Sequence, residues 1–203
     1  MFSGMPGFDE TFADRPVMAI LRGMPREETV ALATRAWDLG ITAVEVPVQT
    51  PDAMPSLRAA VEAGAERGRL VGAGTVITTE QVTAVAQAGA AFTVAPGLDP
   101  AVAAASLARG LPHLPGVATP TEIQQALRHG LEWVKAFPAS ALGTAWFAAM
   151  RGPFPGLKIV ATGGMDARNA AEYLDAGARV VAVGSALTDP VQVDLLAELA
   201  QRR

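Results

Sequence analysis

The sequence predicts an α/β protein in which eight parallel strands alternate with helices and close into one small (β/α)₈ barrel with short loops. Eight short apolar runs predict buried strands at 17–23, 43–48, 70–76, 92–97, 111–117, 133–138, 158–164 and 180–187. Their starts lie 19 to 27 residues apart, which leaves room for one helix and two short loops in each unit. The segments between them, such as residues 27–40, carry apolar residues at helical spacing.

Residues that begin and end helices mark the junctions between these elements. A glycine stands before most of the apolar runs, as at Gly40, Gly89 and Gly130, where it can adopt the left-handed conformation that ends a helix. Residues 78–81 and 119–122 have the pattern of capping boxes, which begin helices. An open, doubly wound sheet is the alternative architecture, but eight units favour a barrel and no G-x-G-x-x-G fingerprint follows the first run.

Length and composition fit a single domain over residues 1–203, with residues 1–15 as an N-terminal extension or short helix. A formal net charge of −4 and the lack of a basic block argue against a nucleic-acid or membrane-surface partner. The chain has no cysteine, and its two histidines, His113 and His129, lack metal-ligand spacing, so we expect neither a metal site nor a thiol nucleophile. No apolar run approaches the ~20 residues of a membrane span, and the N-terminus does not resemble a signal peptide, so we expect a cytoplasmic protein.

The candidate functional residues follow from the barrel geometry, because (β/α)₈ barrels carry their chemistry at the C-terminal ends of the strands. Polar residues or glycines interrupt the apolar runs at these ends, at Arg22, Glu45, Thr75, Lys135, Thr162, Gly163, Gly164, Gly184 and Ser185. We therefore expect one candidate site at this end of the barrel.

Lys135 is the most informative of these residues, since the chain has only one other lysine, Lys158, against fourteen arginines. Period-2 alternation places Trp133, Lys135 and Phe137 on one face of their strand, which we expect to face the barrel interior. Desolvation disfavours the charged form of a buried amine, and a neutral amine can attack a ketone to form a Schiff base, which arginine cannot do. The same alternation sends Glu45 inward, so a purely structural Lys135–Glu45 ion pair stays open as the alternative.

Two glycine-containing stretches follow the last two expected strands. Gly163 and Gly164 stand ahead of an expected helix start at Asp166, and Gly184 with Ser185 repeats the pattern after the next strand. In barrels these positions commonly form a phosphate site from backbone N–H groups and a helix N-terminus. Tight turns that need glycine for backbone reasons are the alternative for each stretch alone.

Seven stretches in order along the chain resemble the KDPG/KHG class I aldolases, which act on 2-keto-3-deoxy-6-phosphogluconate and 4-hydroxy-2-oxoglutarate. They are AVEVPVQTP, LVGAGTV, VAPGLDP, LPGVATPTE, VKAFPAS, GPFPGLKIVATGG and AVGSAL. The resemblance implies a small (β/α)₈ barrel, usually a homotrimer, that needs no metal or organic cofactor. It implies reversible cleavage of a phosphosugar acid to pyruvate and glyceraldehyde 3-phosphate, or of 4-hydroxy-2-oxoglutarate to pyruvate and glyoxylate.

The resemblance also implies roles for individual residues. Lys135 in VKAFP would be the Schiff-base lysine, and Glu45 in VEVP would be the general acid/base that works through a bound water. The residues implied at the pyruvyl end of the substrate are Thr75, Pro96 and Phe137. The residues implied at the phosphate are Gly163, Gly164, Gly184 and Ser185.

The chain departs from the family pattern at Gln49. Many members have an arginine at this position, four residues after the glutamate, to bind the substrate carboxylate. In other members an arginine at the end of the first strand does so, in a stretch like LRG, and Arg22 fits that role. VEVPVQTP and FPASALG also resemble the subgroup that acts on the galactonate-derived epimer, so the sequence leaves the C4 stereochemistry of the substrate open.

Two functions of other kinds stay as alternatives. Another phosphate-binding barrel enzyme, such as a thiamine-phosphate-synthase-like protein or an isomerase, would use the glycine turns without a Schiff-base lysine. A non-catalytic sugar-phosphate-binding barrel would bind a phosphosugar acid without turnover.

Overall fold

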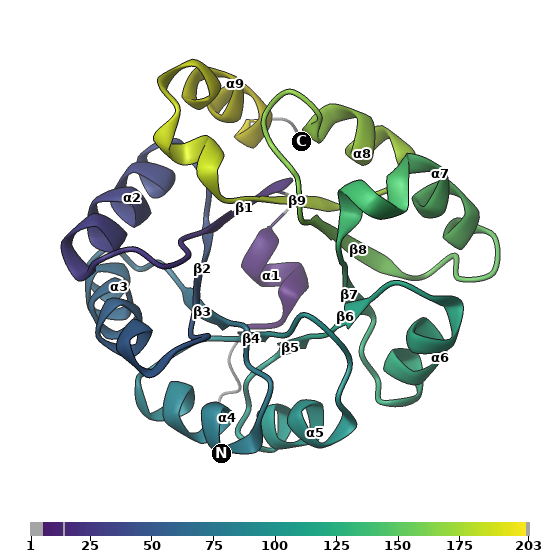
Figure 1. The fold of residues 1–203 in the computed structure, drawn as a ribbon, viewed down its shortest axis with the longest axis horizontal. Coiled ribbons are helices and arrows are strands. Elements are labelled where there is room, and N and C mark those ends of the chain that lie inside the picture. Colours follow the sequence, from purple (N-terminus) through teal and green to yellow (C-terminus); the bar gives the residue numbers. More distant parts are fainter. Residues whose placement is uncertain (1–5, 14, 202–203) are drawn as a thin grey trace.

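The apolar runs form parallel strands that curve into a nearly closed barrel, with helices around its outside (Figure 1). The computed structural model describes residues 6–13 and 15–201, so the expected N-terminal extension lies partly outside the described residues. The strands are β1 (Val17–Ile20), β2 (Ala43–Pro47), β3 (Val71–Gly74), β4 (Thr93–Val94), β5 (His113–Leu114), β6 (Gly116–Val117), β7 (Trp133–Ala136), β8 (Lys158–Thr162) and β9 (Val180–Val183). Their order in the sheet is β5-β4-β3-β2-β1-β9-β8-β7-β6.

Helices connect the strands and cover the outer face of the sheet (Figure 1). The α-helices are α1 (Phe8–Phe12), α2 (Arg26–Asp38), α3 (Met54–Glu66), α4 (Thr79–Gln87), α5 (Pro100–Ala108), α6 (Pro120–Arg128), α7 (Ala139–Arg151), α8 (Ala170–Ala176) and α9 (Pro190–Ala200). The short 3₁₀ helices η1 (Pro51–Ala53) and η2 (Ser185–Thr188) precede α3 and α9. Both predicted capping boxes are present: Thr78 caps α4 and Thr119 caps α6.

The fifth predicted strand is divided into β5 and β6, because Pro115 lies in its middle and has no N–H for the ladder. β5 pairs with β4, and β6 pairs with β7. The carbonyl of Pro115 still accepts a hydrogen bond from the Lys135 N–H at 2.8 Å, and the Gly116 N–H donates to Gly97 O at 3.2 Å. The two halves therefore link both edges of the sheet, and the barrel prediction is confirmed over the open, doubly wound alternative.

One predicted helix start is wrong. We expected a helix from Asp166, but α8 begins at Ala170. The Asp166 carboxylate accepts hydrogen bonds from the N–H groups of Arg168 at 2.8 Å and Asn169 at 3.0 Å, and the Asn169 side chain accepts one from the Asp166 N–H at 3.0 Å. Asparagine and aspartate favour such local turns, and this turn separates the Gly163–Gly164 stretch from the helix.

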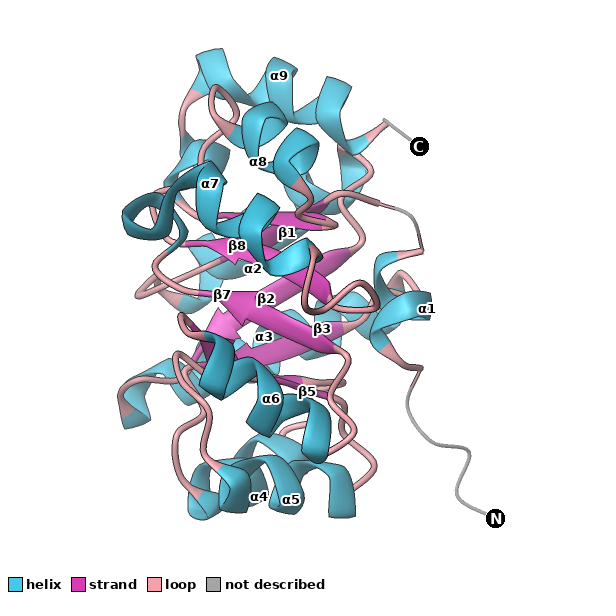
Figure 2. Ribbon diagram, turned by 90° about the vertical axis from the view of Figure 1, so that its right-hand side faces the viewer, coloured by secondary structure: helices cyan, strands magenta, loops and turns pink. Residues whose placement is uncertain are grey.

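The barrel interior is filled by apolar side chains and closed at one end by α1. Interior side chains such as Ile20, Phe92 and Val160 form one buried cluster with Phe8 and Phe12 of α1. A separate, larger cluster lies between the outer face of the sheet and the helices. Figure 2 shows α1 beyond one end of the strands, and the chain enters β1 directly after it, so α1 covers the N-terminal end. The predicted site residues stand toward the opposite, C-terminal ends of the strands.

Candidate active site

Lys135 lies inside the barrel on β7, with only 3% of its surface exposed. Its register partner Val160 belongs to the interior apolar cluster, so the two side chains share the inner face of the sheet. The Lys135 Nζ lies 5.2 Å from the centre of the Phe137 ring. Among the described residues, the Lys135 amine has no hydrogen-bonding or ion-pair partner. It is therefore a buried amine that no carboxylate holds in place.

Glu45 lies on the same inner surface, on β2, and is fully buried. Its register partner is Ile20, which is also an interior residue. Neither carboxylate oxygen has a hydrogen-bond partner among the described residues. Gly74 of the neighbouring strand makes room for this carboxylate, because a Cβ at Gly74 would overlap it.

Burial controls the ionisation of this carboxyl group. It raises the pKa of Glu45 above the usual range, against the opposing effect of the positive charges of Lys135 and Arg22. In the described part of the chain no ion pair joins Lys135 to Glu45. The structural ion pair that the sequence left open is therefore not formed. A buried amine and a buried carboxyl group with a raised pKa therefore face the same interior space.

Arg22, Gln49 and Thr75 meet at the rim of the barrel above Glu45. The Arg22 Nη1 donates to the Gln49 Oε1 at 3.5 Å and to the Thr75 Oγ1 at 3.3 Å. Thr75 has a φ of 57°, an unfavourable left-handed conformation for a β-branched residue. Such strain persists where the surrounding structure enforces it, often at functional sites. The contacts place the Arg22 charge over the open end of the barrel.

The turn after β8 packs against the Lys135 strand. A Cβ at Gly163, where φ is 96°, would press on the Phe137 ring, and one at Gly164, where φ is 75°, would overlap the Ser140 side chain. Both positions therefore need glycine for space as well as for conformation. The structure thus brings Gly163, Gly164 and Phe137 together beside Lys135.

The remaining predicted site residues are Pro96, Gly184 and Ser185. Pro96 follows β4 and is exposed, and its carbonyl lies where a Cβ at Gly116 would be. A Cβ at Gly184 would lie 3.6 Å from the Ile20 carbonyl oxygen, which places Gly184 beside the end of β1. Ser185 begins η2, but its side chain lies outside the described part of the structure. Pro96 and Gly184 follow strand ends, and no hydrogen bond joins their described atoms to the side chain of Lys135 or Glu45.

The site prediction missed Ser140 and gave no role to Thr162. Thr162 ends β8, is 4% exposed, and its buried Oγ1 has no hydrogen-bond partner among the described residues. Alternation from the interior residue Val160 would have placed Thr162 inward. Ser140 carried no such signal, because its contact with Gly164 depends on two loops that are distant in sequence.

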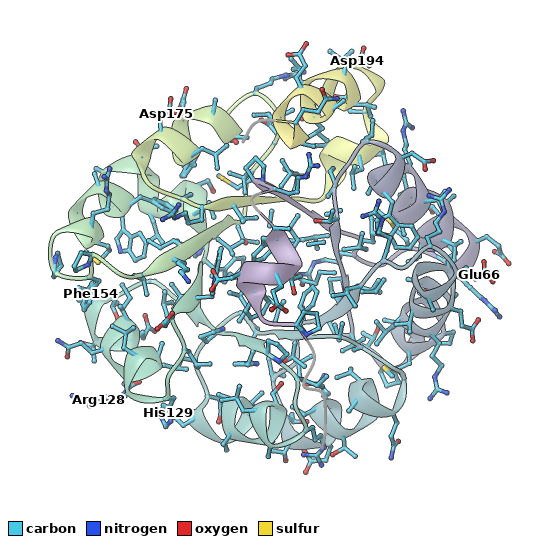
Figure 3. The ribbon with its side chains drawn as sticks, turned by 180° about the vertical axis from the view of Figure 1, so that it is seen from behind. Glu66, Arg128, His129, Phe154, Asp175 and Asp194 are labelled. Carbon is cyan, nitrogen blue, oxygen red and sulfur yellow. The ribbon has the colours of Figure 1, made fainter. Side chains whose placement is uncertain are left out.

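The two histidines lie away from this site. His113 is buried on the outer face of the sheet, where Nδ1 lies 2.8 Å from the Thr93 Oγ1, and Thr93 lies 2.6 Å from the Ser106 Oγ. Burial lowers the pKa of His113 to about 4. His129 is the C-cap of α6 at the outer edge of the molecule (Figure 3). Neither histidine contributes to the barrel mouth.

Comparisons with known proteins connect this geometry to a family. The sequence profile described as KDPG and KHG aldolase matches residues 8–199. The chain is 41% identical over 178 residues to a probable 2-dehydro-3-deoxy-6-phosphogalactonate aldolase of Rhizobium meliloti, which covers 87% of this chain and 84% of that one. It is also 41% identical over 167 residues to a 2-dehydro-3-deoxy-phosphogluconate aldolase of Treponema pallidum, covering 82% of this chain and 78% of the other.

Solved structures of aldolases are similar to this chain as well. A structure described as native KDPGal superimposes with a TM-score of 0.81 at 35% identity, over 91% of this chain and 90% of that one. A KDPG aldolase of Legionella pneumophila, with pyruvate captured as a covalent carbinolamine, gives a TM-score of 0.81 at 32% identity, over 94% of each chain. A thiamine phosphate pyrophosphorylase from Pyrococcus furiosus, at 19% identity and a TM-score of 0.72, shares the fold alone. This chain, with its buried lysine and glutamate at the open end of the barrel, belongs to the KDPG and KHG aldolase family of carbon–carbon lyases.

Proposed function

We propose that the protein is a class I aldolase that reversibly cleaves a 2-keto-3-deoxy-6-phosphosugar acid to pyruvate and glyceraldehyde 3-phosphate through a Schiff base on Lys135. The observation that carries this proposal is a buried lysine and a buried glutamate on one inner surface that do not pair with each other. An ion pair would occupy both groups, whereas without one the amine and the carboxyl group can each act on a bound substrate.

Lys135 carries the covalent chemistry. Its amine attacks the 2-keto carbon to give a carbinolamine, which loses water to form the imine. The Phe137 ring near Nζ and the apolar interior keep bulk water from the reacting carbon. The carbinolamine of the Legionella relative supports the same first step here.

Glu45 moves the proton. As a carboxylate, Glu45 takes the proton from the C4 hydroxyl. The C3–C4 bond then breaks, and the electron pair of this bond flows into the imine to give an enamine. Glyceraldehyde 3-phosphate leaves, Glu45 returns the proton to C3, and hydrolysis of the imine releases pyruvate. Burial suits this role, because a raised pKa brings the acid closer to working pH.

The charged ends of the substrate fit the two sides of the mouth. Arg22, held by Gln49 and Thr75, supplies the guanidinium that would bind the carboxylate. The N–H groups of Gly163, Gly164 and Met165 donate no hydrogen bond to any other described residue. Unpaired backbone donors in a turn suit a phosphate, and Gly184 and Ser185, which follow the next strand, would complete this side.

The substrate could be either of two phosphosugar acids that differ in configuration at C4. We propose the galactonate-derived phosphosugar acid as the alternative to the gluconate-derived one, since one relative at 41% identity carries each name. The stretches VEVPVQTP, which contains Gln49, and FPASALG resemble the galactonate-type subgroup and support this alternative. The 4-hydroxy-2-oxoglutarate activity remains part of the proposal, although that substrate has no phosphate for the glycine turn.

A trapping experiment tests the mechanism. Borohydride reduction in the presence of pyruvate should attach pyruvate covalently at Lys135, identified by peptide mass spectrometry. No adduct, or an adduct at Lys158, would contradict the mechanism and favour a non-catalytic or isomerase-type barrel. Comparison of kcat/KM for the two C4-epimeric phosphosugar acids then assigns the substrate.

We further propose a cytoplasmic homotrimer. Support for an oligomer comes from a designed protein cage made by fusing symmetric oligomeric domains, which matches 92% of this chain and 69% of the cage chain at a TM-score of 0.81. None of the helices among the described residues has the length and apolarity to cross a membrane. Sedimentation equilibrium would measure the subunit number, and a monomer or dimer at micromolar concentration would contradict the trimer.

A further inference from the structure

Ser140 joins the segment after Lys135 to the glycine turn after β8. It is the second residue of α7 and is exposed. Its N–H donates to the Gly163 carbonyl at 3.0 Å, and its Oγ lies against Gly164, where a Cβ would overlap it. The segment that follows the Lys135 strand and the Gly163–Gly164 turn are therefore in direct contact.

The hydrogen-bond donors at this contact are unusually free. The Ser140 hydroxyl donates to no other described residue, and the N–H groups of Gly163, Gly164 and Met165 are likewise unpaired within the described chain. The nearby carbonyls are occupied, because Gly163 O accepts from Ser140 and Gly164 O accepts from Asn169 Nδ2 at 2.9 Å. In these two trans peptides the N–H groups, which belong to Gly164 and Met165, point away from the partner of the carbonyl. One hydroxyl and three amides thus remain for an outside acceptor.

The chemistry of the donors indicates the acceptor. A serine hydroxyl beside successive backbone N–H groups matches the several oxygens of a phosphate monoester better than a single sugar hydroxyl. The neighbouring Asp166 does not compete, since its carboxylate is held by the N–H groups of Arg168 and Asn169.

We propose that Ser140 is a specificity-determining residue whose hydroxyl donates to the substrate phosphate at the Gly163–Gly164 turn. This inference rests on the proposed aldolase function and adds a residue from the Lys135 loop to it. Because Ser140 follows Lys135 by five residues, phosphate bound here would also fix the position of the reacting carbon relative to the amine. Binding energy from a remote group can be used in this way at the reacting centre.

The test compares Ser140→Ala with Ser140→Thr, which keeps a hydroxyl, and with Thr121→Ala as the matched control. Thr121 is also an exposed hydroxyl residue at the second position of a helix, α6, elsewhere on the barrel. Each variant is assayed with the phosphorylated sugar acid and with its dephosphorylated counterpart. Inorganic phosphate is used as a competitive inhibitor of the phosphorylated reaction.

Loss of one hydrogen bond to a charged group should lower kcat/KM of Ser140→Ala for the phosphorylated substrate by about 10- to 100-fold. The dephosphorylated substrate should react as with the wild type, phosphate inhibition should weaken, and Ser140→Thr and Thr121→Ala should behave as the wild type. An equal loss on both substrates, or no loss on the phosphorylated one, would overturn the role of Ser140. Pyruvate trapping separates the two proposals. If the wild-type protein traps pyruvate at Lys135, the aldolase function stands regardless of the result for the Ser140 variants. If the wild-type protein does not trap pyruvate, both proposals are overturned.

Discussion

The two lysines of this chain lie at opposite ends of one barrel and have opposite surroundings. At the N-terminal end, the Lys158 Nζ donates to both carboxylate oxygens of Asp9 at 2.8 Å and lies 5.7 Å from the centre of the Trp133 ring. At the C-terminal end, Lys135 has no such partner among the described residues, and the nearby Glu45 oxygens are unpaired as well. Of the two lysines, Lys158 has a carboxylate partner and Lys135 has none among the described residues, which fits a barrel whose chemistry lies at the C-terminal end of the strands.

Aromatic packing reinforces this difference. At the N-terminal end the Phe12 ring lies 5.7 Å from Phe8 and 4.9 Å from Trp133, and Phe8 lies 5.5 Å from Phe92. The mouth has instead a buried amine, a buried acid and a strained Thr75. Buried polar groups without partners lower the free energy of unfolding, and the aromatic packing at the N-terminal end offsets part of this loss.

The largest expected effect comes from replacing the free lysine. Lys135→Arg should lower kcat by about 10⁴-fold or more, the scale of removing a covalent nucleophile, because a guanidinium forms no imine. Steady-state pyruvate release measures this. The matched Lys158→Arg variant should keep near wild-type activity, and a comparable loss in that variant would contradict the division between the two ends.

Glu45→Gln should lower kcat by about 10²- to 10⁴-fold, the usual share of a general acid/base. It should also stabilise the fold, because the raised pKa means that the folded protein binds this proton more tightly than the unfolded chain. The contribution of Glu45 to stability therefore falls as pH rises above about 4, the usual carboxyl pKa. Thermal melts should show no advantage of the variant below that pH and a growing one toward neutral pH. A variant less stable at neutral pH would count against an unpaired buried carboxyl.

Phe12→Ala tests the closed end. Phe12 is 2% exposed, and truncating a buried phenylalanine costs about 3–5 kcal/mol of unfolding free energy. Urea denaturation measures this loss, while kcat/KM of the folded fraction should stay at the wild-type value. Phe154→Ala, a half-buried ring at the outer edge of the molecule (Figure 3), is the control and should cost less. A large loss of kcat with little loss of stability would show that α1 takes part in the chemistry.

The smallest effect belongs to the exposed ion pair of the closed end. Hydrogen bonding from Lys158 lowers the pKa of Asp9, so its contribution to stability is present above the usual carboxyl pKa and is lost as pH falls through the lowered value. Asp9 is largely exposed, so Lys158→Met should cost at most about 1 kcal/mol, and less at high salt. Chemical denaturation at two salt concentrations measures it. A cost that salt leaves unchanged would point to packing on Trp133 as its source.

The sequence by itself determined the local features of this protein. Alternating hydrophobicity placed the eight strand regions, and the capping boxes at Thr78 and Thr119 began their helices, because each signal acts within a few residues. Alternation also showed which face of a strand Lys135 and Glu45 occupy. The predicted helix start at Asp166 was wrong, because the side-chain hydrogen bonds of Asp166 favour a turn there.

Only the tertiary structure decided which distant residues meet. The Lys158–Asp9 contact joins positions 149 residues apart, and the contact of Ser140 with Gly164 joins two separate loops. It also decided that Lys135 and Glu45 remain unpaired, although their residue types would have suited an ion pair. Such outcomes depend on how distant elements pack, which no local pattern encodes: closure of the barrel leaves the Lys135 amine without a partner among the described residues, and the docking of α1 under the barrel gives Lys158 the Asp9 carboxylate.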